Sequence, residues 1–182
     1  MMDKFLNTPN KQIDTSWIES LALDELNMEE SGVIRFDEHL NPQSYLEESS
    51  IKFMDQVRDK LEVYVNLFNQ YRGGDQTPKI KIFKISNTIN DFMLFRNSLR
   101  LVFARRSNDC ITIGFLSNRE GMFSPRVNFT DNGELKGENS FHEIKANIGP
   151  YNSVSWRFRG EPIDIDAMVR HYLTEFIKNS AT

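Results

Sequence analysis

The sequence predicts an α+β fold, a curved, mostly antiparallel six-stranded sheet with two helices packed on one face. Short segments in which apolar and polar residues alternate are concentrated between residues 79 and 158. One long apolar stripe at helical spacing precedes them, and a second one closes the chain. The connections between successive strands are short, which favours a meander of antiparallel strands over parallel crossovers.

The length of 182 residues suits one domain preceded by an arm. We expect residues 1–43 to form an acidic N-terminal arm and residues 44–182 to form a single α+β domain. Within the arm, residues 15–26 have the pattern of a short helix and residues 33–36 that of a short strand. Because Trp17 is too large and apolar to stay in water, we expect the arm to dock on its own domain or on that of a second copy.

A long helix is predicted after the arm. Asn41 and Pro42 suit its start, as the capping residue and the first helical residue. Apolar residues then recur at helical spacing from Ile51 to Tyr71, and two glycines at 73 and 74 end the helix. At 1.5 Å per residue, about 22–30 residues would span ~33–45 Å and cover most of the sheet.

The six strands are predicted at residues 79–85, 98–104, 110–115, 126–130, 142–148 and 154–158. In the second, Leu99 and Phe103 share one face and Arg100 points the other way. Residues 105–109 are predicted to be the loop of a hairpin. In the first strand, a change of phase between Ile82 and Phe83 indicates a β-bulge.

A clear amphipathic helix is predicted at residues 165–177, with Asp164 as its cap. Its apolar stripe and the apolar faces of the strands are expected to point into the same layer of the protein. One hydrophobic cluster should therefore contain Phe103, Ile113, Trp156, Phe158 and Phe176.

Charge is distributed unevenly, although the net charge is only −4. Residues 1–50 hold 3 basic and 11 acidic side chains, whereas residues 79–128 hold 9 basic and 3 acidic ones. By strand phase, or by position at a strand tip, six arginines are predicted to form a basic binding surface. They are Arg100, Arg105, Arg106, Arg126, Arg157 and Arg159.

These observations favour a non-enzymatic binding or adaptor module that recognises a protein partner through a basic sheet face, with a homodimer as the expected assembly. Two alternatives remain open. The same arginines could bind nucleic acid, although a pI near 5.5 counts against that. The 14 phenylalanines could instead line a cavity for an apolar ligand between the long helix and the sheet.

The sequence contains few candidates for catalytic or metal-binding residues. No glycine-rich phosphate loop and no metal-ligand spacing is found, so no catalytic residue, metal or cofactor is predicted. His142 is expected to be partly buried and hydrogen-bonded, and Cys110 to be a small core residue. The single cysteine, the lack of a signal sequence and the lack of a long apolar run favour a cytoplasmic protein without a membrane span.

Overall fold

The computed structural model describes residues 13–32, 41–74, 76–117 and 141–181. Residue contacts divide the chain into two units, Met1–Leu40 and Asn41–Thr182. The first unit contains helix α1, Ser16–Ser31, which begins one residue after the start of the helix expected at residues 15–26 and continues beyond its end. Gly32 ends α1 in the left-handed conformation, where its N–H donates to the carbonyl of Met28. The strand expected at residues 33–36 lies outside the described residues.

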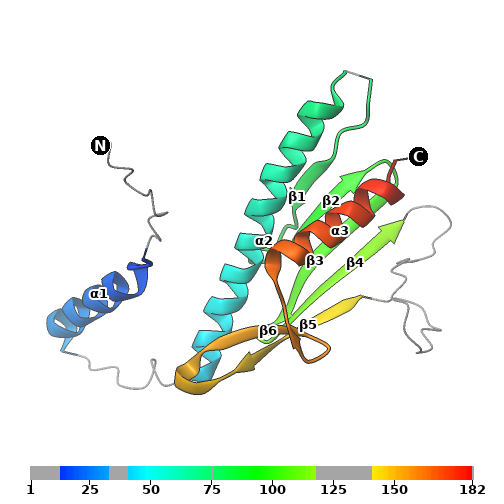
Figure 1. The fold of residues 1–182 in the computed structure, drawn as a ribbon. Helices are drawn as coiled ribbons and strands as arrows, with labels where there is room; N and C mark the ends of the chain where they lie inside the picture. Colours follow the sequence, from blue (N-terminus) through cyan, green and yellow to red (C-terminus); the bar gives the residue numbers. More distant parts are fainter. Residues whose placement is uncertain (1–12, 33–40, 75, 118–140, 182) are drawn as a thin grey trace, which may run out of the picture. The chain divides into compact units, whose positions relative to one another are not determined.

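The second unit consists of two helices and one antiparallel sheet (Figure 1). The strands lie side by side in chain order, β1 to β7. In order, the elements are α2 (Pro42–Arg72), β1 (Lys81–Lys84), β2 (Phe92–Arg96), β3 (Leu99–Ser107), β4 (Cys110–Ser117), β5 (His142–Ile148), the 3-10 helix η2 (Pro150–Asn152), β6 (Val154–Phe158), β7 (Glu161–Pro162) and α3 (Ile165–Asn179).

The α+β class is as predicted, but the described residues alone form seven strands of the sheet, where six were expected in all. The sequence pattern misses β2, because both faces of that strand carry apolar residues and no alternation is visible. It also misses β7, which has only two residues. β1 pairs with β2 in regular register, so the bulge expected between Ile82 and Phe83 is wrong. The strand expected at residues 126–130 lies outside the described residues.

The helix boundaries follow the predicted capping residues. The Asn41 side chain accepts a hydrogen bond from the Gln43 N–H at 3.0 Å, and Pro42 is the first residue of α2. The Asp164 carboxylate accepts from the Ala167 N–H at 3.1 Å and caps α3. After Arg72, two glycines with positive φ take the chain out of the helix.

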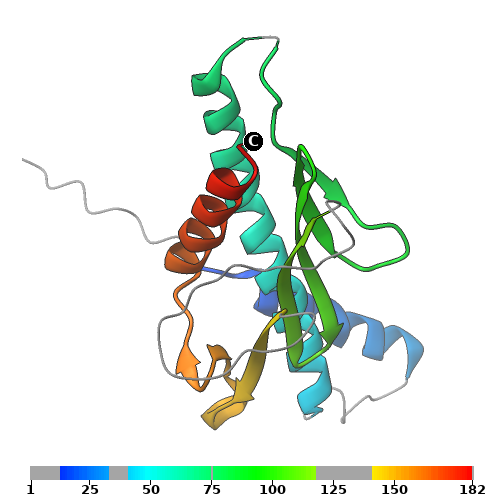
Figure 2. The same ribbon diagram turned by 90° about the vertical axis from the view of Figure 1, so that its right-hand side faces the viewer.

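Cross-strand pairing assigns each strand residue to one of two faces. Two cross-strand rows define the inner face. One row contains Leu94, Leu101 and Phe115, and the other contains Phe92, Phe103, Ile113 and His142. The buried residues of α2 and α3 belong to the same hydrophobic cluster as these rows. Figure 2 shows both helices on this side of the sheet. We call the opposite side the outer face.

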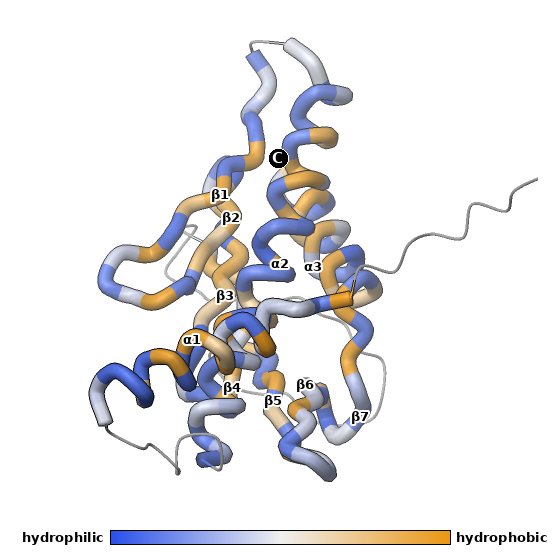
Figure 3. Tube along the Cα trace, turned by 90° about the vertical axis from the view of Figure 1, so that its left-hand side faces the viewer, coloured by the Kyte–Doolittle hydropathy of each residue, from blue (hydrophilic) through white to orange (hydrophobic). Residues whose placement is uncertain are grey.

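The core between the helices and the inner face contains the residues that were predicted for it. Phe103, Ile113, Trp156 and Phe176 are buried in one cluster, and Phe158 is partly buried against it. The rings of Phe92 and Phe103 stack at 4.8 Å. Strands β2 to β4 are apolar along most of their length, because several of their outer-face positions carry apolar residues as well (Figure 3).

Polar side chains fix the position of α2 along the sheet at both ends. Near its C-terminus, Asn69 donates from Nδ2 to the carbonyl of Ile80 at 2.9 Å and accepts from the Ile80 N–H at 3.0 Å. Near its N-terminus, the indole Nε1 of Trp156 donates to Ser49 Oγ at 3.1 Å. Asn90 donates to the carbonyl of Ile51 at 3.0 Å. These bonds join groups that burial would otherwise leave unsatisfied.

Replacing Phe103 by Ala should lower the free energy of unfolding by roughly 3–5 kcal/mol, because the change leaves a cavity in a packed core. Chemical denaturation measures the loss. Phe83→Ala on the outer face is the matched control and should cost much less, since Phe83 is 42% exposed. Equal losses in the two variants would show that the assignment of the faces is wrong.

Candidate functional site

The outer face of β1 to β4 presents apolar side chains to solvent. Two adjacent cross-strand rows carry them: Phe83, Met93 and Val102 in one row, and Phe95, Arg100 and Leu116 in the next. The rings of Phe83 and Phe95 lie 6.5 Å apart, and the Arg100 guanidinium lies 6.0 Å from the centre of the Phe95 ring. An aromatic pair with an arginine stacked on it is therefore partly exposed on this face.

A third aromatic ring extends the surface across β4. Phe141 lies directly over Gly114, and a Cβ atom at Gly114 would overlap the ring. The guanidinium of Arg106 lies 5.9 Å from the centre of the same ring. The absence of a side chain at Gly114 thus leaves room for the ring of Phe141. Phe141 and Arg106 form a second arginine–aromatic pair.

Three of the six predicted arginines occupy outer-face positions. They are Arg100 and Arg106 on β3, and Arg157 on β6 opposite Lys145 of β5. Arg159 follows β6 in a turn, over the ring of Phe158 at 5.3 Å. Arg126 lies outside the described residues. The cationic side chains Lys81 and Lys145, which the sequence reasoning left out of the site, also occupy outer-face positions.

Arg105 lies within β3 and not in the predicted loop, because the strand continues to Ser107 and only Asn108 and Asp109 form the turn. Its register partner is Ile111, which places it on the inner side. The guanidinium Nη1 donates to Ser50 Oγ at 3.0 Å and to Asn108 Oδ1 at 3.1 Å. Arg105 is therefore part of β3 and not of the predicted loop, and it ties β3 to α2.

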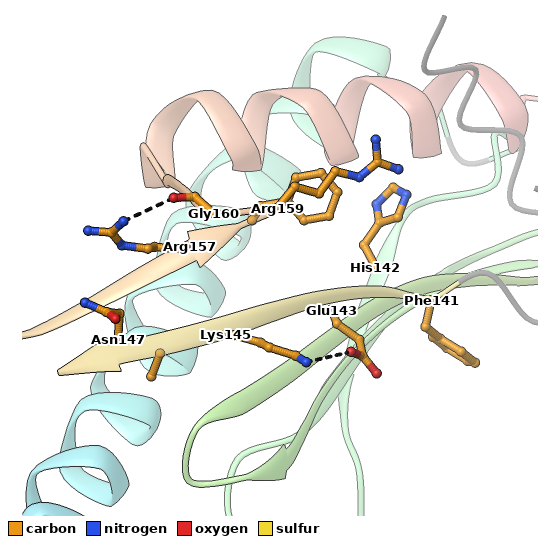
Figure 4. A pocket seen from close by; sticks show the side chains of 10 residues that line it. Phe141, His142, Glu143, Lys145, Asn147, Arg157, Arg159 and Gly160 are labelled. Atoms are coloured by element: carbon orange, nitrogen blue, oxygen red, sulfur yellow. Dashed lines mark hydrogen bonds and ion pairs between the residues drawn. The ribbon is translucent and has the colours of Figure 1, made fainter. Parts of the chain in front are cut away.

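A cavity of about 600 Å³ opens between β5 and β6 (Figure 4). It does not lie between α2 and the sheet, where the apolar-ligand alternative requires one. Its lining comes from both strands and the turn after β6: Phe141, His142, Glu143, Lys145, Ala146, Asn147, Arg157, Phe158, Arg159 and Gly160.

His142 is partly buried at this cavity, as expected, and its Nδ1 lies 2.5 Å from the hydroxyl oxygen of Tyr172 on α3. Burial, and then the nearby charge of Arg159, lower the pKa of His142. Burial likewise raises the pKa of Tyr172. Both groups are therefore neutral at neutral pH, and when Tyr172 donates to Nδ1, the imidazole proton lies on Nε2.

Arg96 on the inner face of β2 is a charged residue that sequence reasoning missed. It is only 2% exposed, and no described residue accepts a hydrogen bond from its Nε or Nη1. Its guanidinium lies 5.6 Å from the centre of the Phe68 ring. Burial, followed by the charge of Arg72, lowers the pKa of Arg96. Because β2 shows no alternation of apolar and polar residues, no local pattern marked Arg96 as an inner-face residue.

Comparison of the chain with protein-family models, with curated proteins and with solved structures finds no match in any of the three. Within the part of the chain that the structure describes, no three His, Cys, Asp or Glu side chains lie together as metal ligands would. None of the described helices has both the length and the hydrophobicity needed to cross a membrane.

Lowering the pH from 7 to 5 should destabilise the protein through His142. Its pKa in the folded protein is below the unfolded value of about 6.5, so the unfolded chain takes up more protons as the pH falls. The contribution of His142 to the free energy of unfolding is therefore fully present above about pH 6.5 and decreases below it. Chemical denaturation at pH 7 and pH 5 should show that His142→Gln loses less stability between the two pH values than the wild type does.

Tyr172→Phe is the control for this effect. It should keep a pH dependence of the same sign, because burial and the charge of Arg159 still depress the pKa of His142. An NMR titration that places the pKa of His142 above 6.5 in the folded protein would contradict the assignment.

Replacing Arg96 by Met should leave the free energy of unfolding unchanged or raise it by about 1–2 kcal/mol, since an apolar side chain removes the cost of a poorly bonded buried charge. Methionine also packs well beside Phe68. Arg170→Met on the exposed side of α3 controls for the loss of one charge. A loss above about 2 kcal/mol in thermal or chemical unfolding would show that the guanidinium is well satisfied.

Proposed function

We propose that this protein is a non-enzymatic binding or adaptor module that recognises a protein partner through the outer face of β1 to β4. The supporting observation is the partly exposed group formed by Phe83, Phe95 and Arg100. Aromatic residues and arginines dominate the binding energy of protein interfaces. A face that only contacted water would be expected to carry mostly polar side chains in these positions.

Charge narrows the class of partner. Lys81, Arg100 and Arg106 lie on this face, and its described strand positions in β1 to β4 hold no carboxylate. A segment with acidic residues around apolar anchors would complement it. Burial of the anchors would supply most of the affinity, and the charges would direct the encounter and the orientation.

Helix α1 has the chemistry of such a segment. It contains five acidic residues and no Lys or Arg. Trp17, Leu21 and Met28 recur at helical spacing, and Trp17 is 64% exposed. We therefore propose the arm of a second copy as one occupant of the face, in a homodimer. The single cysteine supports a reducing, cytoplasmic location for it.

A labelled peptide of residues 14–32 should bind the full-length protein in fluorescence anisotropy at low salt. Changing Phe95 and Arg100 together to Ser should weaken this binding at least about tenfold, because an aromatic anchor and its arginine are typical hot spots of about 2 kcal/mol or more. Lys178→Ser on α3 is the matched surface control and should have no effect. A peptide with its acids changed to Lys should bind poorly.

Deleting residues 1–40 should strengthen peptide binding, since no arm then competes for the face, and should abolish concentration-dependent self-association in sedimentation experiments. The proposal fails if the peptide binds neither the full-length nor the shortened protein. Binding of single-stranded DNA or RNA to Arg100 and Arg106, with the steep salt dependence of phosphate contacts, would replace it with the nucleic-acid alternative.

A further inference from the structure

The cavity between β5 and β6 exists because the two strands separate. Their pairing covers Lys145↔Arg157 to Ile148↔Val154 and goes no further towards the start of β5. Beyond Arg157, β6 pairs on its other side, where Phe158 lies opposite Glu161 of β7. The first residues of β5 and the last residues of β6 therefore diverge, and the cavity of about 600 Å³ lies in the opening (Figure 4). Its size is within the range of small-molecule sites.

Positive charge is concentrated around this opening. Lys145, Arg157 and Arg159 all line the cavity, from β5, from β6 and from the turn that follows. Glu143 is the one carboxylate of the lining, and its Oε2 lies 3.6 Å from Lys145 Nζ. With His142 neutral, the lining keeps a positive balance that favours an anion.

Hydrogen bonds hold the guanidinium of Arg157 in place. Arg157 donates from Nη1 to the carbonyl of Gly160 at 3.1 Å and from Nε to Ser155 Oγ at 3.5 Å. Arg159 and Gly160 both have positive φ, 51° and 87°, and form the tight turn between β6 and β7. A guanidinium fixed in this way loses less entropy on binding a ligand and presents its remaining N–H groups in one plane.

One wall of the cavity is apolar. The ring of Phe158 lies 5.3 Å from the His142 imidazole, and the Arg159 guanidinium lies over the Phe158 ring at the same separation. Ala146 also lines the cavity. A ligand with an anionic group and a small ring or aliphatic part would satisfy both the cations and this wall.

We propose that the cavity between β5 and β6 is a binding site for a small organic anion that carries a phosphate or carboxylate group. Arg159 binds this group beside the Phe158 ring, and Arg157 and Lys145 add positive charge on the other side of the opening (Figure 4). A phosphate group and a carboxylate group both match the planar fork of a guanidinium, which can donate two parallel hydrogen bonds to either anion. Phe141 borders both surfaces, but otherwise the site uses β5, β6 and the following turn, whereas the protein-binding face uses β1 to β4. This inference therefore does not depend on the proposed function.

NMR titration of the full-length protein tests the site, with inorganic phosphate, phenyl phosphate and benzoate as probes. Saturable shifts are expected for the Nε–H signals of Arg157 and Arg159 and for the His142 ring. Phenyl phosphate should bind more tightly than inorganic phosphate if the apolar wall contributes. Comparing phenyl phosphate with benzoate then identifies which anionic group the site prefers.

The double variant Arg157→Gln/Arg159→Gln should weaken the best probe at least about tenfold, because the charge-assisted contact of Arg159 and the second positive charge of the lining are lost. Arg157→Lys/Arg159→Lys keeps the charge without the planar fork, and should restore only part of the affinity. Arg170→Gln on the exposed side of α3 is the control for net charge and should bind like the wild type. Circular dichroism of each variant checks that it is folded.

Equal affinity in the wild type and in a folded double Gln variant would overturn the proposal, as would the absence of saturable shifts with all three probes. Phe95→Ser/Arg100→Ser should leave probe binding unchanged, and the double Gln variant should leave binding of the residue 14–32 peptide unchanged. The experiments can therefore reject one proposal without rejecting the other.

Discussion

The second unit depends on one long helix that shares a core with one face of a sheet and is fixed to it at both ends. Met54, Val57 and Leu61 of α2 are fully buried against the inner face. Hydrophobic contact alone would allow a helix to slide, because apolar burial has no direction. The paired bonds of Asn69 with Ile80, and the bond from Trp156 to Ser49, remove that freedom. Since α3 packs on the same side, no described helix of this unit covers the outer face, and its aromatic residues remain partly accessible (Figure 2).

Sequence reasoning identified the elements whose pattern has one apolar side. α3 and β4 are examples, because an inner stripe contrasts with more polar positions on the other side. β2 was missed for the opposite reason, since Met93 and Phe95 are apolar on the outer face as Phe92 and Leu94 are on the inner one. The residues that hid β2 from a pattern search are therefore among those that make the outer face a candidate binding surface.

The candidate sites could be predicted only in part, because they depend on distances that no local pattern encodes. The orientation of Arg100 followed from strand phase, whereas the position of Arg105 changed when β3 proved to be longer than expected. The partial burial of His142 was predictable, but its partner Tyr172 is 30 residues away on another element. The opening between β5 and β6 arises from the early turn at Arg159 and Gly160, which sends β6 to a different neighbour.

The two outermost strands limit how the protein can assemble. β1 has four residues and begins and ends with lysines, and β7 has two residues, one of which, Pro162, lacks an N–H. Neither offers a long row of free backbone donors and acceptors to an incoming strand. Lateral growth of the sheet into ribbons or fibrils is therefore disfavoured at both margins. Any contact between two copies of this protein would therefore use side-chain surfaces and not the pairing of sheet edges.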